Sequence, residues 1–416
     1  MHSHIRWLAF VSLSGAATAV SMARAQGPGA VVPRVAGGVD VASPSLVAPF
    51  KAGNHYFDMD AAGMLRVRDG ERAISRPLIQ LGSNTTVAPS HRGRYIAYGA
   101  GQRDARYYDV RVRDVQTGRD LPDVLHHARI SPAPWSHDEK GFLYVRVDTT
   151  DGRERVYYHG LGRVEANDAL ILSQFDHPEW RYVARVSDDG HYAVFTISYP
   201  ADAHTRIYFI DLVDPGKPNF GAPVVKLTQT FDARYEFVDN AGAYFFLQSD
   251  RDAPLGRILL ANTDLIRESR WPSLIPETGD TLVYARTAGD EYLVAVYRSA
   301  SGATTARLFG PEDPAVLRTE MRNRLDSLNK ARQRDDDRRQ SRGMQPRGLM
   351  GNGPVIRLTP RSGIPVPAGS SIIALNSVAD DQQLFYTVRL SNGSTQSFMY
   401  DVKRGTNAPY PSPSQP

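Results

Sequence analysis

The sequence contains no cysteine among its 416 residues. Disulfides, catalytic thiolates and thiolate zinc sites are therefore excluded, and an apolar core alone must hold the fold. A chain of this length can bury enough surface for that. The net charge is also small, formally +4, so no nucleic-acid partner is expected.

Long apolar runs are missing as well. Nothing approaches the roughly 20 residues needed to cross a bilayer, so the chain is not expected to be transmembrane. The start reads MHSHIRWLAFVSLSGAATAVSMARAQ, with Arg6 before an apolar stretch at 8–20 and Ala23-Arg24-Ala25 after it. This pattern predicts a signal peptide at 1–25 and a periplasmic or secreted protein, the alternative being a buried N-terminal helix. Residues 26–45 are expected to be flexible.

A short pattern is repeated through the rest of the chain: a turn, an aromatic residue, then alternating apolar residues. Its anchoring aromatics are Tyr56, Tyr95, Phe142, Tyr192, Tyr244, Tyr292 and Phe385. The first six are roughly 40–50 residues apart, a period typical of propeller blades. Strand-like segments follow each anchor, with no helical periodicity between them. The sequence therefore predicts an all-β fold, a seven-bladed β-propeller over 46–405.

The stretch SDDGHYAVF at 187–195 places Asp188, Asp189 and His191 within four positions. Two carboxylates beside a histidine could form an acid/base cluster. The stretch also matches the repeated pattern, in which Asp caps its own backbone and Gly190 accepts a positive φ. We interpret it as a hairpin turn, with His191 entering the next strand.

The interval between the last two anchors is nearly doubled. Asp313-Pro314 is a good helix start, and Leu317, Met321, Leu325 and Leu328 follow at helical spacing. This predicts a helical and charged insertion in blade six at 312–349. It could be a docking arm for a partner or an anionic surface, but a solvated insertion is favoured. The Pro/Ser-rich end, 406–416, is expected to be a disordered tail.

Other candidate sites have simpler structural interpretations. The adjacent residues His126 and His127 would point to opposite faces of a strand, which disfavours a metal site. His137-Asp138-Glu139 falls in another blade turn. The loop GNG at 351–353 lacks the lysine of a phosphate loop, and Asp335-Asp336-Asp337 is flanked by arginines. No metal, cofactor or substrate-binding residue is therefore assigned.

Residues 109–145 read DVRVRDVQTGRDLPDVLHHARISPAPWSHDEKGFLYV, and VYYHGLG (156–162), VSDDGHY (186–192) and DPGKPNFGAPVVKLT (214–228) follow in order. Together these segments resemble the N-terminal β-propeller domain of the prolyl oligopeptidase family of serine endopeptidases. The resemblance runs from about 45 to 275, and more weakly to 403. Two departures concern turns. Glu139 stands at a usual glycine, and His91-Arg92 replaces a common Pro-Asp.

Enzymes of this family also carry an α/β-hydrolase domain with a Ser-Asp-His triad, and nothing in this sequence matches it. No G-x-S-x-G motif occurs. Ser370-Ser371 and Ser394 are the nearest candidates, and the last histidine is His204, whereas the hydrolase order puts the histidine last. No catalytic residue is therefore assigned, and the chain is not expected to be an enzyme.

In this family the propeller restricts access to short peptides. The resemblance implies a non-catalytic, peptide-binding or gating role, with a separately encoded α/β-hydrolase or short peptides as partners. A truncated reading frame would give the same sequence. Two alternatives are an independent binding or scaffold propeller and, less favoured, a complete serine peptidase with an unfamiliar site.

Overall fold

The structure is a computed structural model that describes residues 48–410, except 82–85, 101–106, 265, 267–270, 290, 313–357 and 378–380. Its regular elements in that part are 27 β-strands and one three-residue 3-10 helix, η1 (Glu165–Asn167). The all-β prediction is therefore confirmed for the described residues.

Five of the sheets contain four antiparallel strands each, paired in chain order. They are the first and the third through sixth of the six sheets in chain order, and each is a simple meander. The sheets are β1 (Phe50–Ala52), β2 (His55–Met59), β3 (Met64–Asp69) and β4 (Arg76–Gln80); β12 (Arg181–Val186), β13 (Tyr192–Tyr199), β14 (Asp202–Asp211) and β15 (Val225–Lys226); β16 (Tyr235–Ala241), β17 (Tyr244–Ser249), β18 (Arg257–Asn262) and β19 (Ser273–Ile275); β20 (Thr281–Ala288), β21 (Tyr292–Arg298), β22 (Thr304–Pro311) and β23 (Leu358–Gly363); β24 (Ser371–Asn376), β25 (Gln383–Arg389), β26 (Thr395–Asp401) and β27 (Thr406–Pro409).

The remaining strands form one seven-stranded sheet. They are β5 (Val87–Pro89), β6 (Tyr95–Ala100), β7 (Tyr108–Asp114), β8 (Asp120–Arg129), β9 (Gly141–Val147), β10 (Glu154–Gly160) and β11 (Ala169–Leu172). The ten-residue strand β8 pairs with β7 along most of its length and then, through Ala128 and Arg129, with β9.

The prediction of seven separate four-stranded blades is therefore wrong. The structure has five four-stranded sheets and one seven-stranded sheet, because β8 pairs with both β7 and β9 and so joins two successive groups of strands. The strand is redirected at His127, which has a positive φ of 50°. The repeat in the sequence marks the hairpins but cannot show that one strand pairs on both sides.

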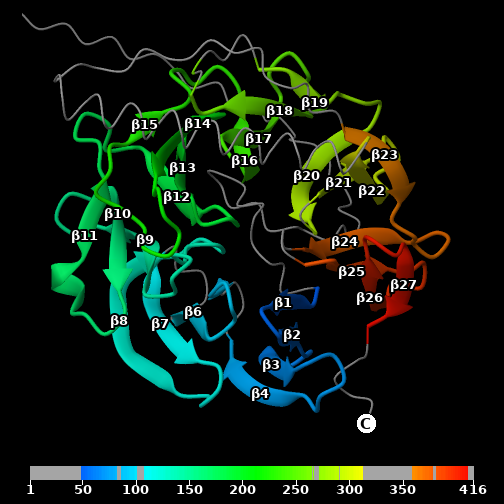
Figure 1. The fold of residues 1–416 in the computed structure, drawn as a ribbon, viewed down its shortest axis with the longest axis horizontal. Coiled ribbons are helices and arrows are strands. Elements are labelled where there is room, and N and C mark those ends of the chain that lie inside the picture. The colour runs from blue at the N-terminus through cyan, green and yellow to red at the C-terminus, as the bar shows by residue number, and fades with distance from the viewer. Residues whose placement is uncertain are drawn as a thin grey trace, which may run out of the picture. The chain divides into compact units, whose positions relative to one another are not determined.

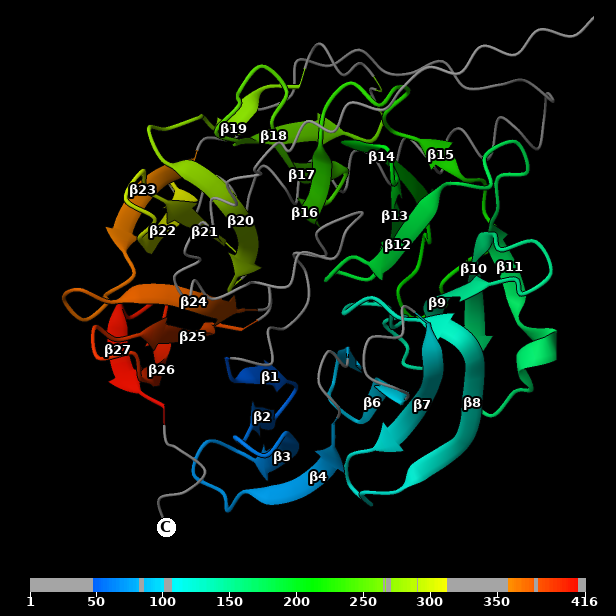
Figure 2. The same cartoon turned by 180° about the vertical axis from the view of Figure 1, so that it is seen from behind.

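The sheets follow one another around a centre, and the first strand of each four-stranded sheet lies innermost (Figures 1 and 2). This is a propeller arrangement. Neighbouring sheets share core clusters: Val194 and Phe209 of one sheet pack with Phe237 and Phe245 of the next. Burying a side chain of this size contributes about 1.5–3 kcal/mol, so contact between sheets is the main source of cohesion.

The repeated turns lie where the pattern predicted them. All seven anchoring aromatics fall on strands. Gly190 has the expected positive φ, 74°, and its N–H donates to the Ser187 carbonyl over 2.8 Å. At the equivalent position of an earlier turn, Glu139 has φ 56° and makes the same bond to Ser136. A residue with a Cβ thus occupies a conformation that favours glycine.

The first and last four-stranded sheets meet through side chains, since no described strand pairs across this seam. The Asn376 amide donates to the carbonyls of Ala48 and Pro49, and the Tyr56 hydroxyl donates to Gln383 Oε1 over 2.8 Å. Side chains of Tyr56, Phe385 and Tyr410 form a small buried cluster there. The propeller is therefore closed by packing and polar contacts.

The chain end corrects another prediction. Residues 406–409 form β27, which pairs with β26, and Tyr410 beyond it is buried. The disordered tail therefore cannot begin at 406. A Pro-containing edge strand suits the outermost position, where no ladder partner is needed on one side.

The predicted signal peptide, the flexible 26–45 segment and residues 313–349 of the predicted insertion lie outside the described residues. The part of the chain that is described contains no helix long and apolar enough to span a membrane.

Candidate functional site

The SDDG stretch is a turn, as predicted, and its carboxylates serve the turn first. Asp189 Oδ1 accepts hydrogen bonds from the Ser187 hydroxyl over 2.7 Å and from the His191 amide over 3.0 Å. Its Oδ2 accepts from the Asn240 side chain of the next sheet over 2.6 Å. Burial opposes ionisation of Asp189, but these bonds, together with the His191 imidazole, lower its pKa. Asp189 is thereby fixed as a structural carboxylate.

The paired histidines do not form a metal site. His126 Nδ1 lies 3.0 Å from Asp109, on the exposed face of β8, and His127 is the exposed residue of positive φ in that strand. No group of three or more histidine, aspartate or glutamate residues in the described ranges is arranged to hold a metal ion. In the second such turn, Asp138 accepts from Ser136, and Glu139 accepts the Arg92 amide over 2.7 Å.

The serine candidates are not brought to a histidine. Ser370 donates to the Pro367 carbonyl, and Ser394 contacts Asn392 within its own turn. His204, the last histidine of the sequence, pairs with Asp202 over 2.9 Å on β14. No described contact joins a serine, a histidine and a carboxylate as a triad would require. The GNG loop at 351–353 and Asp335-Asp336-Asp337 lie outside the described residues.

A cavity of about 370 Å³ lies at the centre of the propeller, bounded by residues from every sheet. This is within the size range of small-ligand sites. Its apolar side chains include Phe50, Phe237 and Phe385. Its charged side chains have both signs and are Lys51, Arg185, Asp188, Glu236, Arg286 and Asp381.

Three of these charged residues, Lys51, Asp381 and Arg185, illustrate how the wall holds its polar groups. Lys51 Nζ lies 2.5 Å from Asp381 Oδ2, across the seam between the first and last sheets. Arg185 donates to the Phe237 carbonyl over 2.8 Å and lies over the Phe237 ring. The wall thus combines oriented polar groups with aromatic surface, an arrangement suited to a peptide-like or zwitterionic molecule.

Successive turns also supply the cavity with imidazoles. The rings of His91 and His137 are in contact, with their centroids 3.7 Å apart and an interplanar angle of 40°. His137 Nε2 lies 3.2 Å from the Asp188 carbonyl oxygen. From the sequence, His137 and Asp188 were predicted only as turn residues. Their contribution to the cavity could not be seen from local patterns, because it depends on the turns of different sheets meeting at the centre.

Asp188, Asp239 and Thr287 form a polar cluster between three successive sheets. The Asp188 amide donates to Asp239 Oδ1 over 3.3 Å, and the Thr287 hydroxyl lies 2.8 Å from Asp239 Oδ2. Asp239 is only 2% exposed. Burial, together with the charges of Asp188 and Asp189, raises the pKa of Asp239 well above its ordinary value. Sequence reasoning missed Asp239, and only its position just before a turn glycine hinted at a special role.

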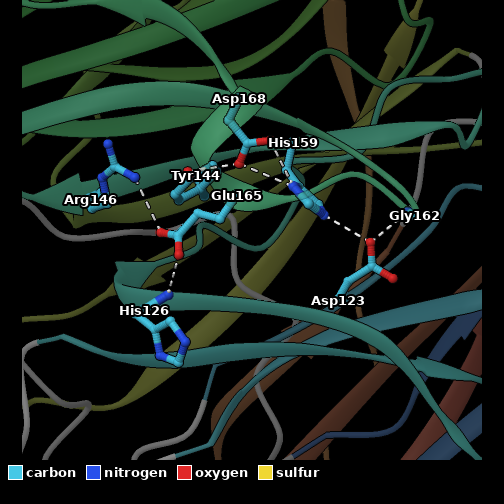
Figure 3. Close-up of polar contacts among 8 residues, drawn as sticks. All are labelled: Asp123, His126, Tyr144, Arg146, His159, Gly162, Glu165 and Asp168. Atoms are coloured by element: carbon cyan, nitrogen blue, oxygen red, sulfur yellow. Dashed lines mark hydrogen bonds and ion pairs between the residues drawn. The ribbon is translucent and has the colours of Figure 1, made fainter.

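A second buried polar cluster lies away from the cavity, where β8, β9 and β10 meet the segment before β11 (Figure 3). His159 is fully buried, and its two ring nitrogens each lie 2.9 Å from a buried carboxylate, Asp123 on one side and Asp168 on the other. Asp168 also accepts from Tyr144, and Asp123 from the Gly162 amide. Burial opposes the charge, but the bonds to both carboxylates raise the pKa of His159 to about 9.

This arrangement fixes the connection between β10 and β11. With both ring nitrogens protonated, His159 donates to both carboxylates, and Glu165 of η1 adds a contact to Arg146 over 3.3 Å. Asp123, His159 and Asp168 are not among the residues that bound the central cavity. The cluster is therefore a structural clamp. The sequence contained its histidine in VYYHGLG, but gave no sign of its two distant partners.

Comparison with known proteins agrees with this architecture. Residues 83–410 match the family model for the prolyl oligopeptidase N-terminal β-propeller domain. The chain is 28% identical over 288 residues to prolyl oligopeptidase A from Galerina marginata, covering 62% of this chain and 36% of the relative. It is 27% identical over 278 residues to a prolyl endopeptidase from Elizabethkingia meningoseptica, covering 61% and 37%. The chain thus spans little more than a third of the length of these relatives.

Solved structures give the same result. One from a structural and mechanistic study of two prolyl endopeptidases superposes with a TM-score of 0.67 at 20% identity, covering 88% of this chain and 48% of that one. Oligopeptidase B from Leishmania major gives a TM-score of 0.63 at 12% identity, covering 88% and 48%. At these identities the likeness shows the fold alone. Because the family model covers most of the sequence, the chain belongs to the prolyl oligopeptidase N-terminal β-propeller domain family.

Proposed function

We propose that this chain is an exported, non-catalytic propeller that admits and binds short peptides in its central cavity, either alone or beside a separate α/β-hydrolase. The observation that carries the proposal is the 370 Å³ cavity, with oriented charges of both signs beside aromatic surface. Such a wall can pair with the termini and side chains of a peptide while packing against its apolar parts.

The non-catalytic part of the proposal is supported by the chemistry of the described residues. Ser370 and Ser394 bond to neighbouring backbone or turn groups, and the buried His159 is held between two carboxylates away from the cavity. The matched family model is that of a propeller domain. A nucleophile with an adjacent base is the minimum that acyl transfer to serine requires.

The first experiment tests catalysis and binding together. The purified full chain is incubated with a Gly-Pro fluorogenic peptide, and the expected result is no release of fluorophore. Calorimetry then measures binding of a series of unlabelled peptides of two to eight residues. Cleavage that a serine-directed phosphonate blocks would overturn the non-catalytic role. Absence of binding across the series would overturn the peptide-binding role.

A matched pair of variants locates the site. Arg286 bounds the cavity, whereas Arg298 is exposed at the end of β21. Arg286→Gln should weaken peptide binding, and Arg298→Gln, which removes the same charge, should not. Equal effects would mean that peptides bind elsewhere on the propeller, as an independent scaffold would allow.

Export is tested separately. Full-length chain and a chain lacking residues 1–25 are expressed in a Gram-negative host, and the periplasmic and cytoplasmic fractions are compared. We expect only the full-length chain to reach the periplasm, shortened near Gln26. Retention of both forms in the cytoplasm would contradict export.

A further inference from the structure

Two residues that line the central cavity, Asp188 and Thr287, are linked to the buried Asp239, so that oxygen-bearing side chains from three sheets form a row. Thr287 Oγ1 on β20 lies 2.8 Å from Asp239 Oδ2 on β16 and 3.4 Å from Asp188 Oδ2 in the β12–β13 turn. The threonine hydroxyl therefore stands between two carboxyl groups. The longer contact is the weaker of the two.

Asp239 departs from a regularity of the repeat. In four successive hairpins, a turn carbonyl accepts a hydrogen bond from the amide of the residue directly after β7, β10, β14 or β18. The accepting residues are Arg94, Lys140, His191 and Ala243. Four residues before each of them lie Ser90, Ser136, Ser187 and Asp239. Three hydroxyls, which can both donate and accept, are thus followed by a carboxyl, which when ionised can only accept.

With an aspartate at position 239 in place of a serine, the number of hydrogens available to Thr287 and the two carboxyl groups becomes important. If Asp188 and Asp239 were both ionised, the single hydroxyl hydrogen of Thr287 could serve only one of them. If Asp239 is protonated, its O–H donates to Thr287 Oγ1, and the threonine hydrogen is free to point to Asp188 Oδ2. Both contacts are then made with one added proton. The protonated acid also regains the donor that serine supplies in the earlier hairpins.

The charges around Asp239 favour that proton. Burial is the main cause that raises the pKa of Asp239, and the charges of Asp188 and Asp189 in the β12–β13 turn add to it. A hydrogen bond donated by Thr287 and the charge of Arg185 on β12 act in the opposite direction. Three other titratable or charged groups lie near these linked side chains. His137 contacts the Asp188 carbonyl, His191 contacts Asp189, and Arg286 is next to Thr287 in the sequence. A carboxylic acid kept neutral among carboxylates is the expected outcome where like charges cannot all be ionised.

We propose that Asp188, Thr287 and Asp239 form a proton latch, in which one proton ties the turn at 187–190 to β16 and β20 at the cavity wall, and loss of that proton to solvent releases the turn. On release, the two carboxylates repel each other and one loses its contact with Thr287. The latch is a property of the cavity wall and does not depend on whether peptides bind there.

The test follows the proton and the turn in the full chain. Aspartate carboxyl carbons are labelled with carbon-13, and the Asp239 resonance is the one lost in Asp239→Asn. It should remain in the acid form while exposed aspartates titrate near pH 4. In parallel, amide hydrogen exchange is measured at 187–190 and expressed as protection relative to unstructured peptide. In the wild type, protection should fall by about tenfold or more as Asp239 ionises.

Two matched comparisons distinguish the latch from a general effect of pH. In Asp239→Asn the amide can still donate to Thr287, so protection of the turn should no longer depend on pH. Asp252→Asn makes the same change at an exposed carboxylate, and should behave like the wild type. A wild-type Asp239 that titrates with the exposed aspartates, or an unchanged pH dependence in Asp239→Asn, would overturn the proposal.

Substitution of the bridging residue gives a second check if Asp239→Asn does not fold. Thr287→Val keeps the shape but removes the hydroxyl, and should lower protection of the turn at every pH. Thr287→Ser keeps the hydroxyl and should preserve the wild-type profile. Equal behaviour of these two variants would show that Thr287 does not bridge the carboxyls.

Discussion

Two buried titratable groups in this propeller have surroundings that favour opposite charge states. His159 lies between Asp123 and Asp168, and its surroundings favour the charged form. Asp239 lies beside Asp188 and Asp189, and its surroundings favour the neutral form. The first cluster is a base between two acids, away from the cavity. The second is an acid among acids, and its partners Asp188 and Thr287 line the cavity.

The difference shows where each group can respond to its environment. The positive charge of His159 is matched on both sides, so it should stay protonated at neutral pH and simply hold β8, β10 and the segment before β11 together. Around Asp239, burial and the charges of Asp188 and Asp189 favour the protonated form, whereas the charge of Arg185 opposes it. A matched charge cluster gives rigidity, whereas an unmatched one can change state with pH.

The largest expected effect comes from breaking the clamp. His159→Leu leaves two buried carboxylates without their shared partner, and should lower the free energy of unfolding by about 3–5 kcal/mol. Urea denaturation of the full chain measures it. Replacing Asp123 and Asp168 by Asn in the same background should recover part of the loss. A loss below about 1 kcal/mol would mean that the carboxylates find other partners or water.

The next effect is the pH dependence of the same clamp. The pKa of His159 is raised in the folded state, from an ordinary value near 6.5 to about 9. Its contribution should therefore be complete below about pH 6.5 and be lost as the pH rises through 9, a change of about 3 kcal/mol. Unfolding free energies measured from pH 6 to pH 10 should show this decline. In His159→Leu that part of the decline should be absent.

Asp239→Asn should have a smaller effect of the opposite sign. Because the folded state raises the pKa of Asp239, the wild type loses stability as the pH rises from about 4 through the folded pKa. The neutral amide should therefore make the chain more stable than the wild type at pH 7, in proportion to the elevation of the pKa, at about 1.4 kcal/mol for each unit. The two proteins should be nearly equal at pH 3. A variant less stable than wild type at pH 7 would contradict the neutral state of Asp239.

The smallest expected effect comes from a substitution in a turn, outside the clusters around His159 and Asp239. Glu139→Gly relieves a positive φ but removes the contact of Glu139 Oε1 with the Arg92 amide. These changes oppose each other, and we expect a net gain below about 1 kcal/mol. Thermal unfolding beside Gly190→Ala supplies the comparison: that change imposes a positive φ on the equivalent turn and also places the new Cβ 2.5 Å from His137 Cβ, so it should cost more stability than the positive φ alone. A clear loss in Glu139→Gly would show that the contact with Arg92 outweighs the strain.

Local patterns in the sequence were sufficient for the all-β propeller, the repeated hairpins and the turn at 187–190. Each depends on the alternation of apolar residues and on turn residues within a few positions, both of which local chemistry dictates. The positive φ of Glu139 could also be anticipated, because the repeat has glycine at that place. The pairing of β8 with both β7 and β9 could not be anticipated, because it depends on which strands meet after the chain has bent at His127.

The sequence by itself thus determined the type of fold and the places where the chain turns. Only the tertiary structure decided which turn residues face the central cavity, and which distant carboxylates surround His159 and Asp239. The physical reason is that charge interactions depend on distance in space and on burial. Asp123, His159 and Asp168 are brought together by strand pairing, and Asp188, Asp239 and Thr287 by the packing of three sheets around one centre.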